Sequence, residues 1–534
     1  MRQRYMPLIM ALCVVMGILI GTFYTNHFSG NKLSVINSGT GKLGNLIHII
    51  DDQYVDTVNL SDLVEKAIPQ ILTSLDPHSV YIPAKEAQAA SDDLKGSFFG
   101  VGIEFVIRED TIQVQNVISG GPAETAGLLA GDKIVTIDDK PFVGKECTTD
   151  EAMRRLKGPD KTKVKVGVMR YGSKKVTTYE ITRGEVKTHS ISSTYMIDDR
   201  TGYIRIKNFG ENTYSEMLIA LAELQQQGFS RLIIDLRDNA GGYLEAAVQM
   251  ANEFLPKNML IVYTEGRKSS RQEYKTDGRG SYQKLPLAVL INEASASAAE
   301  IFAGAMQDWD RAVVVGRRSF GKGLVQRPFK FEDGSMMRLT VARYYTPSGR
   351  CIQKPYEKGN QKDYADDMLH RLKSGELMSA DSIHFADSLR YYTLRQRRVV
   401  YGGGGIMPDE YVPLDTTKYT RFHRQLAAKG ITITQNLRYV DNHRKQLKSD
   451  YPAFSEFQQR FEIPESLIEA IVKEGEKQGV KPADDEELRQ SLPLMRLQLK
   501  ALVARDLWSM NEFYTIMNEE NDVVRRALQF LNTK

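Results

Sequence analysis

The chain has 534 residues, of which 42% are hydrophobic and 26% are charged, so it can bury sizeable cores and is not a disordered protein. At roughly 100 to 200 residues per domain, this length predicts three or four domains. The 71 Lys and Arg residues stand against 67 Asp and Glu, and the net charge of +4 is too small for this length to indicate a nucleic-acid partner.

Residues 1–30 combine a basic start with an apolar run. Arg2 and Arg4 precede Pro7–Tyr24, an uncharged run that would measure about 27 Å as a helix. That length nearly spans a bilayer, and the basic flank predicts that the start stays in the cytoplasm. No small-residue cleavage site follows, so an uncleaved anchor is favoured over a cleaved signal, with a buried core helix as the weaker alternative. We therefore expect a protein of the cell envelope, anchored in the inner membrane by a single N-terminal span and exposed on the periplasmic side.

Residues 31–95 form a predicted helical region, because apolar residues such as Leu46, Ile49 and Ile50 recur at three-to-four spacing. Gly39–Gly44 matches G-x-G-x-x-G. No convincing strand-turn-helix unit surrounds this match, so a flexible linker is favoured there over a nucleotide site.

Residues 96–184 are rich in short β-type runs separated by turns. Three such runs, Ile112–Val117, Lys133–Ile137 and Val164–Val168, accompany one short helix at Thr149–Leu156. Their order, behind a Gly-Val-Gly-Ile segment, resembles a PDZ domain. We call these residues the PDZ-like domain.

The candidate binding loop of the PDZ-like domain contains Gly100, Val101, Gly102 and Ile103. Its glycines free successive backbone N–H groups to converge on a carboxylate, and the strand that begins at Ile103 can pair with an extended peptide. The C-terminal tails of polypeptide substrates are therefore the expected ligands. The alternative is a glycine-rich hairpin that serves only its turn.

Residues 185–415, which we call the core, alternate strands with helices, a pattern that predicts a largely parallel sheet covered on both faces. The charged stretch 354–398 interrupts two β-like runs and is interpreted as an insertion. The fold class is thus mixed α/β and multidomain. The predicted core elements are strands at Gly202–Ile206, Arg231–Leu236 and Leu285–Ile291 and helices at Tyr214–Gln227, after Gly242 and near Ser297.

Residues 416–534 are predicted to be a charged helical extension, with candidate core contacts such as Phe457, Ile468 and Leu502. No motif there indicates chemistry. Homo-oligomer formation, recruitment of an adaptor and restriction of access to the site all stay open as roles.

The chemistry is not that of a metalloenzyme, because the three cysteines and the scattered histidines provide no metal-binding pattern. We expect no metal and no organic cofactor. Instead, Ser297 lies where small residues enter a helix, among unpaired amides that can stabilise an oxyanion. Ser297 and Glu300 also match a capping box, which is the purely structural alternative. Lys322 lies between two glycines in an apolar neighbourhood, where burial would lower its pKa and leave a neutral amine able to act as a base.

These motifs together resemble the C-terminal processing peptidases, also called tail-specific proteases, a family of serine peptidases with a Ser/Lys dyad. The resemblance covers residues 45–412. Ala240 stands where the family often has proline, and Ala299 where serine is common. The motifs are Asp235–Gly242, Ser295–Ile301, Gly321–Gly323, Tyr345–Arg350 and Gly402–Ile406.

The resemblance implies Ser297 as nucleophile, Lys322 as base and Gln326 as the residue that orients the lysine. It also implies an oxyanion hole formed by the N–H groups of Ala298 and Gly242, and a structural role for Ser295. The function implied is that of a serine endopeptidase that captures C-terminal tails and cleaves by acyl transfer. A PDZ scaffold without catalysis is the alternative.

Two local expectations accompany this site. In a straight strand Lys322 and Gln326 would lie about 13 Å apart, whereas a helical turn would bring them within about 6 Å, so we predict a turn after Gly323. Asp76–Ser79 contains triad-type residues, but adjacent side chains rarely face each other, and a helix-ending turn is favoured there. Asp235, Arg237 and Asp238 are expected to support the oxyanion loop.

Overall fold

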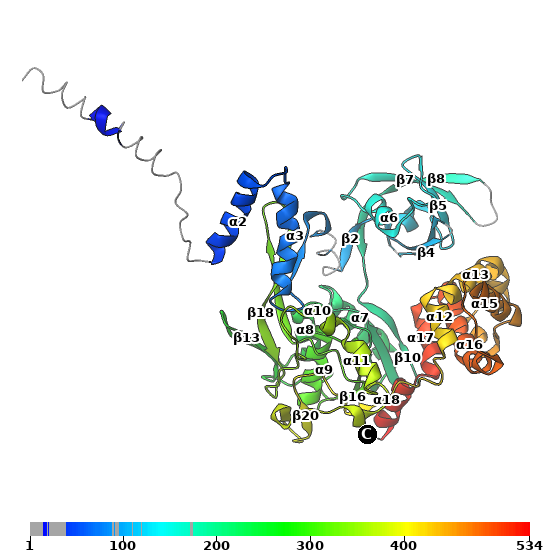
Figure 1. The fold of residues 1–534 in the computed structure, drawn as a ribbon. Helices are drawn as coiled ribbons and strands as arrows, with labels where there is room; N and C mark the ends of the chain where they lie inside the picture. The colour runs from blue at the N-terminus through cyan, green and yellow to red at the C-terminus, as the bar shows by residue number, and fades with distance from the viewer. Residues whose placement is uncertain are drawn as a thin grey trace, which may run out of the picture. The chain divides into compact units, whose positions relative to one another are not determined.

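A computed structural model describes residues 14–18, 20, 39–87, 90, 96–108, 110–118, 120–170 and 175–533. The chain divides into two units, Met1–Ile71 and Leu72–Lys534 (Figure 1). Most of the predicted membrane anchor lies outside the described residues. Among the helices that are described, none is both long and apolar enough to cross a membrane.

The predicted helical region contains α2 (Gly39–Gln53) and α3 (Leu60–Thr73). The interpretation of Gly39–Gly44 as a flexible linker is wrong, because this segment begins α2. The helix forms although each glycine costs about 1 kcal/mol in a helix and although Leu43, Leu46 and Ile49, which recur at helical spacing, are exposed. The region is also not helical throughout: β1 (Val80–Ile82) pairs with a strand of the core.

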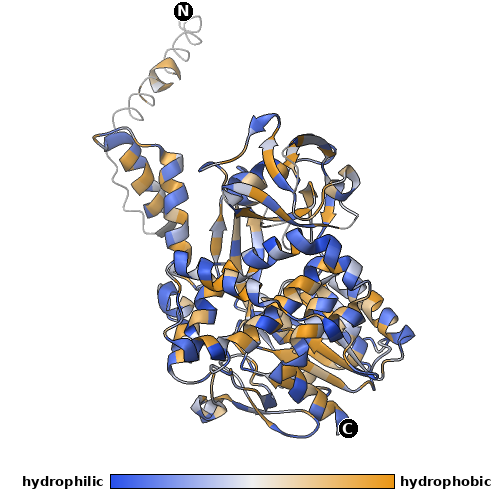
Figure 2. Cartoon of the chain, turned by 90° about the vertical axis from the view of Figure 1, so that its right-hand side faces the viewer, coloured by the Kyte–Doolittle hydropathy of each residue, from blue (hydrophilic) through white to orange (hydrophobic). Residues whose placement is uncertain are grey.

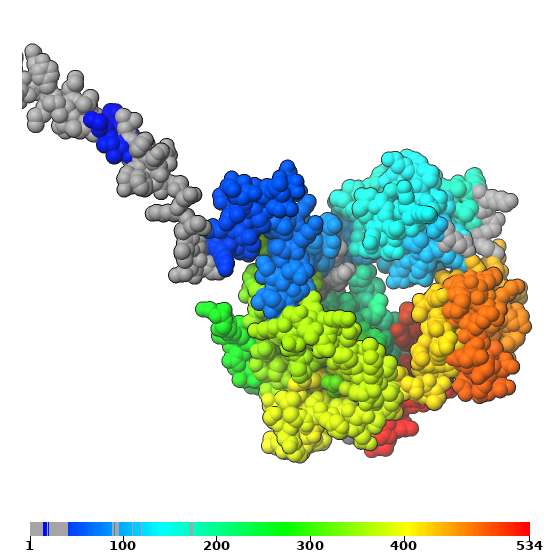
Figure 3. Space-filling model, in the orientation of Figure 1, coloured from blue at the N-terminus to red at the C-terminus, as the bar shows by residue number. Residues whose placement is uncertain are grey.

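The PDZ-like domain is built on one antiparallel sheet, in the order β3-β4-β5-β7-β8. Ile112, Ile134 and Val166 are fully buried in its core. In the space-filling view its cyan atoms form one body (Figure 3). The bounds are β2 Ser97–Gly100, β3 Ile103–Arg108, β4 Thr111–Val117, α5 Pro122–Ala126, β5 Lys133–Ile137, β6 Lys140–Pro141, α6 Thr149–Leu156, β7 Lys163–Met169, β8 Val176–Thr182 and β9 Gly184–Lys187, with β2 paired to β9.

The core contains a six-stranded sheet in the order β10-β11-β12-β15-β16-β21. Pairing is parallel from β11 to β21, and only β10 is antiparallel to its neighbour. The apolar strands form orange bands inside the molecule (Figure 2). The bounds are β10 Ile191–Met196, β11 Thr201–Ile206, β12 Arg231–Asp235, β15 Leu287–Ile291, β16 Val313–Gly316 and β21 Glu410–Tyr411.

Helices cover both faces of this sheet, because successive residues of a strand point to opposite faces. Ile204, Leu232 and Val289 face α7 (Thr213–Gln226), α8 (Leu244–Phe254) and α9 (Ala298–Asp308) in one apolar cluster. Their neighbours along the strands form a second cluster with Val523, Val524, Ala527 and Leu531 of α18 (Asp522–Asn532).

A second core sheet has the order β1-β18-β13-β14, with β17 paired along β18. The predicted insertion contains two short α-helices and the strand β19, which pairs with β20 just beyond its end, and its Tyr364 is buried. The bounds are β13 Leu260–Gly266, β14 Ser269–Lys275, β17 Leu324–Lys330, β18 Met336–Tyr345, α10 Gln361–Ala365, α11 Asp367–Lys373, η1 Ala380–Ser382, η2 Asp387–Leu389, β19 Arg390–Tyr392 and β20 Val399–Tyr401.

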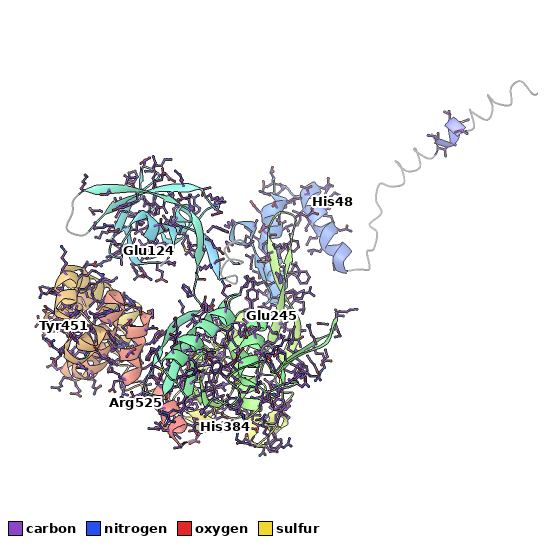
Figure 4. The ribbon with its side chains drawn as sticks, turned by 180° about the vertical axis from the view of Figure 1, so that it is seen from behind. His48, Glu124, Glu245, His384, Tyr451 and Arg525 are labelled. Carbon is purple, nitrogen blue, oxygen red and sulfur yellow. The ribbon has the colours of Figure 1, made fainter. Side chains whose placement is uncertain are left out.

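The predicted C-terminal extension has a core of its own, in which Tyr451, labelled in Figure 4, packs edge-on against Phe457 and Phe461. These residues do not form one separate extension, however, because α18 packs against one face of the six-stranded sheet of the core. The sheet has two apolar faces, and without α18 one of them would meet water. The remaining bounds are α12 Arg421–Ala428, α13 Ile431–Asp450, α14 Phe454–Arg460, α15 Glu465–Lys477, α16 Asp485–Leu507 and α17 Met510–Glu519.

Candidate active site

Ser297 lies in the turn between β15 and α9, immediately before the first helical residue. Its backbone has φ 54° and ψ −115°, a conformation that non-glycine residues rarely adopt and that occurs preferentially at functional sites. Ala296 and Ala298 on either side are buried, whereas Ser297 is only partly buried. The turn therefore presents the serine hydroxyl at the start of a helix, as strand-turn-helix nucleophile turns do.

The loop that packs against this turn depends on two glycines. A Cβ on Gly241 would lie 2.7 Å from Cβ of Ser297 and 2.9 Å from the backbone nitrogen of Ala298. A Cβ on Gly242 would lie 2.1 Å from the carbonyl oxygen of Phe209. Both glycines also have positive φ, so only glycine allows this loop to approach the serine.

The backbone N–H groups of Gly242 and Ala298 donate no hydrogen bond to any described residue, although the neighbouring amides of Gly241 and Tyr243 do. Ala298 is the first residue of α9, where an unpaired N–H is expected. Ala298 directly follows Ser297, and Gly242 directly follows Gly241, whose added Cβ would meet the Ser297 side chain, so both amides belong to the segments that meet at Ser297.

Asp235 is fully buried at the end of β12. It accepts hydrogen bonds from Tyr203 Oη (2.5 Å), Arg205 Nη1 (2.7 Å) and Arg237 Nη2 (2.6 Å). Burial alone would raise the pKa of Asp235, but the charges of Arg237 and Arg205 outweigh it and hold this pKa below its ordinary value. Arg205 also pairs with Asp238 (2.9 Å), so these charged side chains are joined at the start of the predicted oxyanion loop.

Ser295 is fully buried, and its side chain forms hydrogen bonds with main-chain groups. Its hydroxyl donates to the carbonyl of Leu236 (2.7 Å) and accepts from the amide of Asn292 (2.9 Å). Both partners lie next to the ends of core strands. Ser295 therefore fastens the nucleophile turn to the sheet.

Lys322 Nζ donates to Gln326 Oε1 at 3.2 Å, so the structure brings these two predicted residues together. The predicted turn after Gly323 is wrong: β17 begins at Leu324. The expectation compared backbone positions only and ignored the length of the two side chains, which can lean along the strand. A register irregularity in the pairing with β18 falls between Val325 and Gln326 and adds local distortion.

The Lys322 amine is partly buried, and burial together with the positive charge of Arg338 lowers its pKa. Glu300 and Asp76 act in the opposite direction. The net lowering increases the fraction of neutral amine at a given pH, which is the form that can accept a proton.

Two buried side chains bridge the backbones of Ser297 and Lys322. Glu300 accepts from the amide of Ser297 (2.8 Å) and from that of Lys322 (2.9 Å). The Tyr344 hydroxyl contacts the carbonyl oxygens of Ser297 (3.1 Å) and Lys322 (2.5 Å). In the described structure no hydrogen bond joins Ser297 Oγ directly to Lys322 Nζ. The two residues are neighbours because Glu300 and Tyr344 join their main chains.

The Asp76–Ser79 segment is a turn that follows α3, as expected, and Asp76 accepts from the amides of His78 and Ser79 (both 2.9 Å). The turn also reaches the site, because Gln326 Nε2 donates to the carbonyl of His78. Sequence reasoning missed this contact and the bridges through Glu300 and Tyr344. The Ser297–Glu300 spacing was one available signal: the capping-box alternative predicts the bond from the Ser297 amide to Glu300, which the structure contains, but not the second bond from the Lys322 amide.

In the PDZ-like domain the carbonyls of Val101 and Gly102 accept from Ala123 (2.7 Å) and Ile118 (3.0 Å). The amides of Val101 and Gly102 donate to no described residue. The side chains of Val101 and Ile103 are buried, and Gly100 ends β2. β3 lies at an edge of the sheet, so an extended chain could pair beside it. The loop thus offers free N–H groups next to an open strand.

A cavity of about 1020 Å³ is lined by Arg205, Arg237 and Asp238, among others, and does not include Ser297 or Lys322. Most of its other lining residues come from 412–421, 487–497 and 513–523. Within the described residues no cluster of His, Cys, Asp or Glu is arranged to hold a metal.

Three family models match the chain. Residues 200–365 match peptidase family S41, residues 100–181 match the PDZ domain, and residues 422–509 match a family of unknown function, DUF8443.

Known proteins resemble the chain over more than half of its length. A carboxy-terminal-processing protease of Bartonella bacilliformis is 38% identical over 317 residues, covering 58% of this chain and 72% of the relative. A probable CtpA-like serine protease of Staphylococcus aureus is 30% identical over 372 residues, covering 68% and 73%. The solved photosystem II D1 C-terminal processing protease is 29% identical, with a TM-score of 0.34 over 58% of this chain and 89% of that one.

The fold and these matches define a serine-type peptidase that contains a PDZ domain. The chain belongs to peptidase family S41, among the carboxy-terminal-processing peptidases.

Proposed function

We propose that the protein is a serine endopeptidase of the cell envelope that holds a substrate by its C-terminal tail and cleaves it with a dyad of Ser297 and Lys322. The observation that supports this most is the state of Lys322. Its amine has a lowered pKa and is held by Gln326, and its backbone is joined to that of Ser297 by Glu300 and Tyr344.

In the first step the neutral Lys322 amine takes the proton of the Ser297 hydroxyl while Oγ forms a bond to the scissile carbonyl carbon. This step requires the hydroxyl and the amine to approach when substrate binds, and catalytic hydrogen bonds often tighten in this way. The carbonyl oxygen becomes an oxyanion, which the free N–H groups of Gly242 and Ala298 stabilise. One such donor is typically worth about 3 kcal/mol of the barrier.

In the second step the Lys322 ammonium gives its proton to the leaving nitrogen, and the C–N bond breaks to leave an ester on Ser297. Water then attacks this ester, and Lys322 accepts a proton from that water. The second tetrahedral species collapses to release the new carboxyl terminus, and the proton returns to Oγ. The amine thus starts and ends the cycle neutral.

Substrate capture is assigned to the PDZ domain, at Gly100, Val101, Gly102 and Ile103. The free amides of Val101 and Gly102 supply donors for a terminal carboxylate, and the edge strand β3 supplies backbone partners for the tail. A bound tail would also tether the chain and so raise its effective concentration at Ser297.

The location rests on the sequence. The basic start and the uncharged segment Pro7–Tyr24 favour a single span of the inner membrane, with the peptidase on the periplasmic side. Fractionation after protease treatment of spheroplasts checks this proposal. Resistance of the chain to the protease would contradict it.

The catalytic proposal is tested with the full-length chain and an unstructured peptide that ends in a free carboxylate. Ser297→Ala and Lys322→Ala should both abolish cleavage, and a matched peptide with a C-terminal amide should be cleaved more slowly. Wild-type rates in either variant would contradict the dyad. Binding of the tail without cleavage by the wild-type chain would instead identify a scaffold.

A further inference from the structure

The Gln326 amide is placed between two partners that fix which of its ends faces the lysine. Its Nε2 donates to the carbonyl of His78, and its Oε1 accepts from Lys322 Nζ at 3.2 Å. An amide oxygen only accepts and an amide nitrogen only donates. If the amide were flipped, two acceptors, Gln326 Oε1 and the His78 carbonyl oxygen, would face each other. The His78 carbonyl therefore decides how Gln326 meets the amine.

We propose that the Asp76–Ser79 turn is a positioning element of the active site, which holds Lys322 in place through the His78 carbonyl and the Gln326 amide. This inference rests on the proposed Ser/Lys mechanism. The turn acts through Gln326, so its role is to fix where the amine points.

The turn is anchored on Asp76, which is 6% exposed. Besides the amides of His78 and Ser79, its carboxylate accepts from Ser79 Oγ at 2.6 Å and from Thr340 Oγ1 at 3.0 Å. Ser79 Oγ in turn accepts from the amide of Thr340 at 3.1 Å. These contacts fasten the turn to β18.

Thr340, to which the turn is fastened, and Gln326, which the turn positions, lie in one sheet. Thr340 of β18 pairs directly with Gln326 of β17. The His78 carbonyl and the Gln326 amide are consequently fixed to adjacent strands, and their separation does not depend on a flexible loop. Such a preorganised support keeps a catalytic amine within reach of its partner without an entropy cost at the moment of reaction.

His78 contributes its backbone and no charge. Its Nε2 is hydrogen-bonded to the Tyr364 hydroxyl at 2.8 Å. Burial and the charges of Lys322 and Lys354 lower the pKa of His78 to about 4, with Asp76 acting in the opposite direction. The ring is therefore neutral at neutral pH. The charged groups that act on the Lys322 amine are Arg338, Glu300 and Asp76.

Asp76→Ala removes the anchor, and kcat is measured at the alkaline plateau, where Lys322 is neutral in every variant. There kcat reports the position of the amine, separately from its charge. We expect the plateau kcat to fall about a hundredfold with little change in KM, as a misplacement of about 1 Å would cause. Asp76→Asn keeps an oxygen for the backbone amides and should restore most of this loss, although the missing negative charge moves the pH midpoint lower.

The chain contains a matched control for this substitution. Asp198 accepts from the amides of Arg200 (2.9 Å) and Thr201 (2.7 Å) and from the Thr201 hydroxyl (3.0 Å), which is the same turn pattern away from the site. Asp198→Ala should keep the wild-type plateau kcat. If Asp76→Ala does not fold, Thr340→Val removes one contact without a change of charge or shape and should lower the plateau kcat about tenfold.

Several results would overturn the inference. These are a wild-type plateau kcat in Asp76→Ala or Thr340→Val, an Asp76→Asn variant as slow as Asp76→Ala, and an equal loss in Asp198→Ala. Ser297→Ala and Lys322→Ala in the same assay separate the two proposals. If they are inactive while Asp76→Ala turns over normally, only the positioning role fails; if they are active, the Ser/Lys mechanism itself fails.

Discussion

Replacing Glu300 by glutamine tests the bridge between the nucleophile and the base. The Glu300 side chain is fully buried, and its carboxylate accepts four hydrogen bonds. Oε2 accepts from the amides of Ser297 and Lys322. Oε1 accepts from the amide of Gly321 (2.7 Å) and from the hydroxyl of Ser319 (2.5 Å). Burial raises the pKa of Glu300, and these hydrogen bonds act against the rise.

Glutamine has the same shape but only one accepting end. If its nitrogen occupies the Oε2 position, the amides of Ser297 and Lys322 both face a donor and lose their partners. Each buried amide left unpaired costs about 1 to 3 kcal/mol, so the pair predicts a loss of about 2 to 6 kcal/mol in the core. In the other orientation the Gly321 amide loses its partner. Either way the main chain beside Lys322 is released, and kcat falls more than KM rises.

The assay combines thermal unfolding of the full-length variant with steady-state cleavage of a tail-bearing peptide. Glu487→Gln is the matched control, because Glu487 at the start of α16 accepts from the amides of Ala483 (2.6 Å) and Phe422 (2.9 Å) where water has access. There the same change should cost about 1 kcal/mol or less and leave cleavage intact. Equal effects of the two substitutions, or a Glu300→Gln variant with normal stability and turnover, would refute the bridge.

Three further predictions concern the oxyanion loop, the turn and the last helix. Gly241→Ala should abolish cleavage, because its methyl group would meet the Ser297 side chain at 2.7 Å; peptide turnover measures this, and an active, folded variant would contradict it. The pKa of His78 is lowered to about 4 in the folded state, so between pH 6.5 and 4 the unfolded chain binds a proton at this residue before the folded chain does. The free energy of unfolding therefore falls as pH falls through this range, by at most about 3 kcal/mol. His78→Gln should therefore lose less unfolding free energy than the wild type over that range, as urea titrations at the two pH values would show; parallel curves would argue against it. Truncation before Asp522 removes the buried side chains of Val523, Val524, Ala527 and Leu531, worth about 1.5 to 3 kcal/mol for each large one, and should unfold the core as judged by circular dichroism. A stable truncated core would disprove the sealing role of α18.

Much of the site could be predicted because its chemistry lies in short segments. Ser297 and Lys322 each have small residues next to them in the sequence. Small residues are needed where two backbones approach closely, and Gly241 and Gly242 meet the same need in the loop that packs against Ser297. The alternation of strands and helices likewise predicts a covered parallel sheet, which is what the core contains.

The rest depends on contacts between segments that are far apart in the chain. Thr340 Oγ1 binds Asp76 across 264 residues, and no local pattern reports such a contact. The turn expected after Gly323 failed because strand spacing describes Cα positions and not the reach of Lys322 and Gln326. The role of α18 was missed because an amphipathic helix shows that it has a buried face without showing which core it covers.

The central claim is that an amine with a lowered pKa activates Ser297. Competitive acetylation of the full-length chain over a range of pH, with peptide mass spectrometry, follows the titration of the Lys322 amine directly. The proposed mechanism predicts a midpoint below the ordinary value for lysine, and a kcat/KM that rises with pH through that same midpoint, because only the neutral amine accepts the proton. A Lys322 midpoint at or above the ordinary value, or a kcat/KM that does not follow it, would contradict the mechanism.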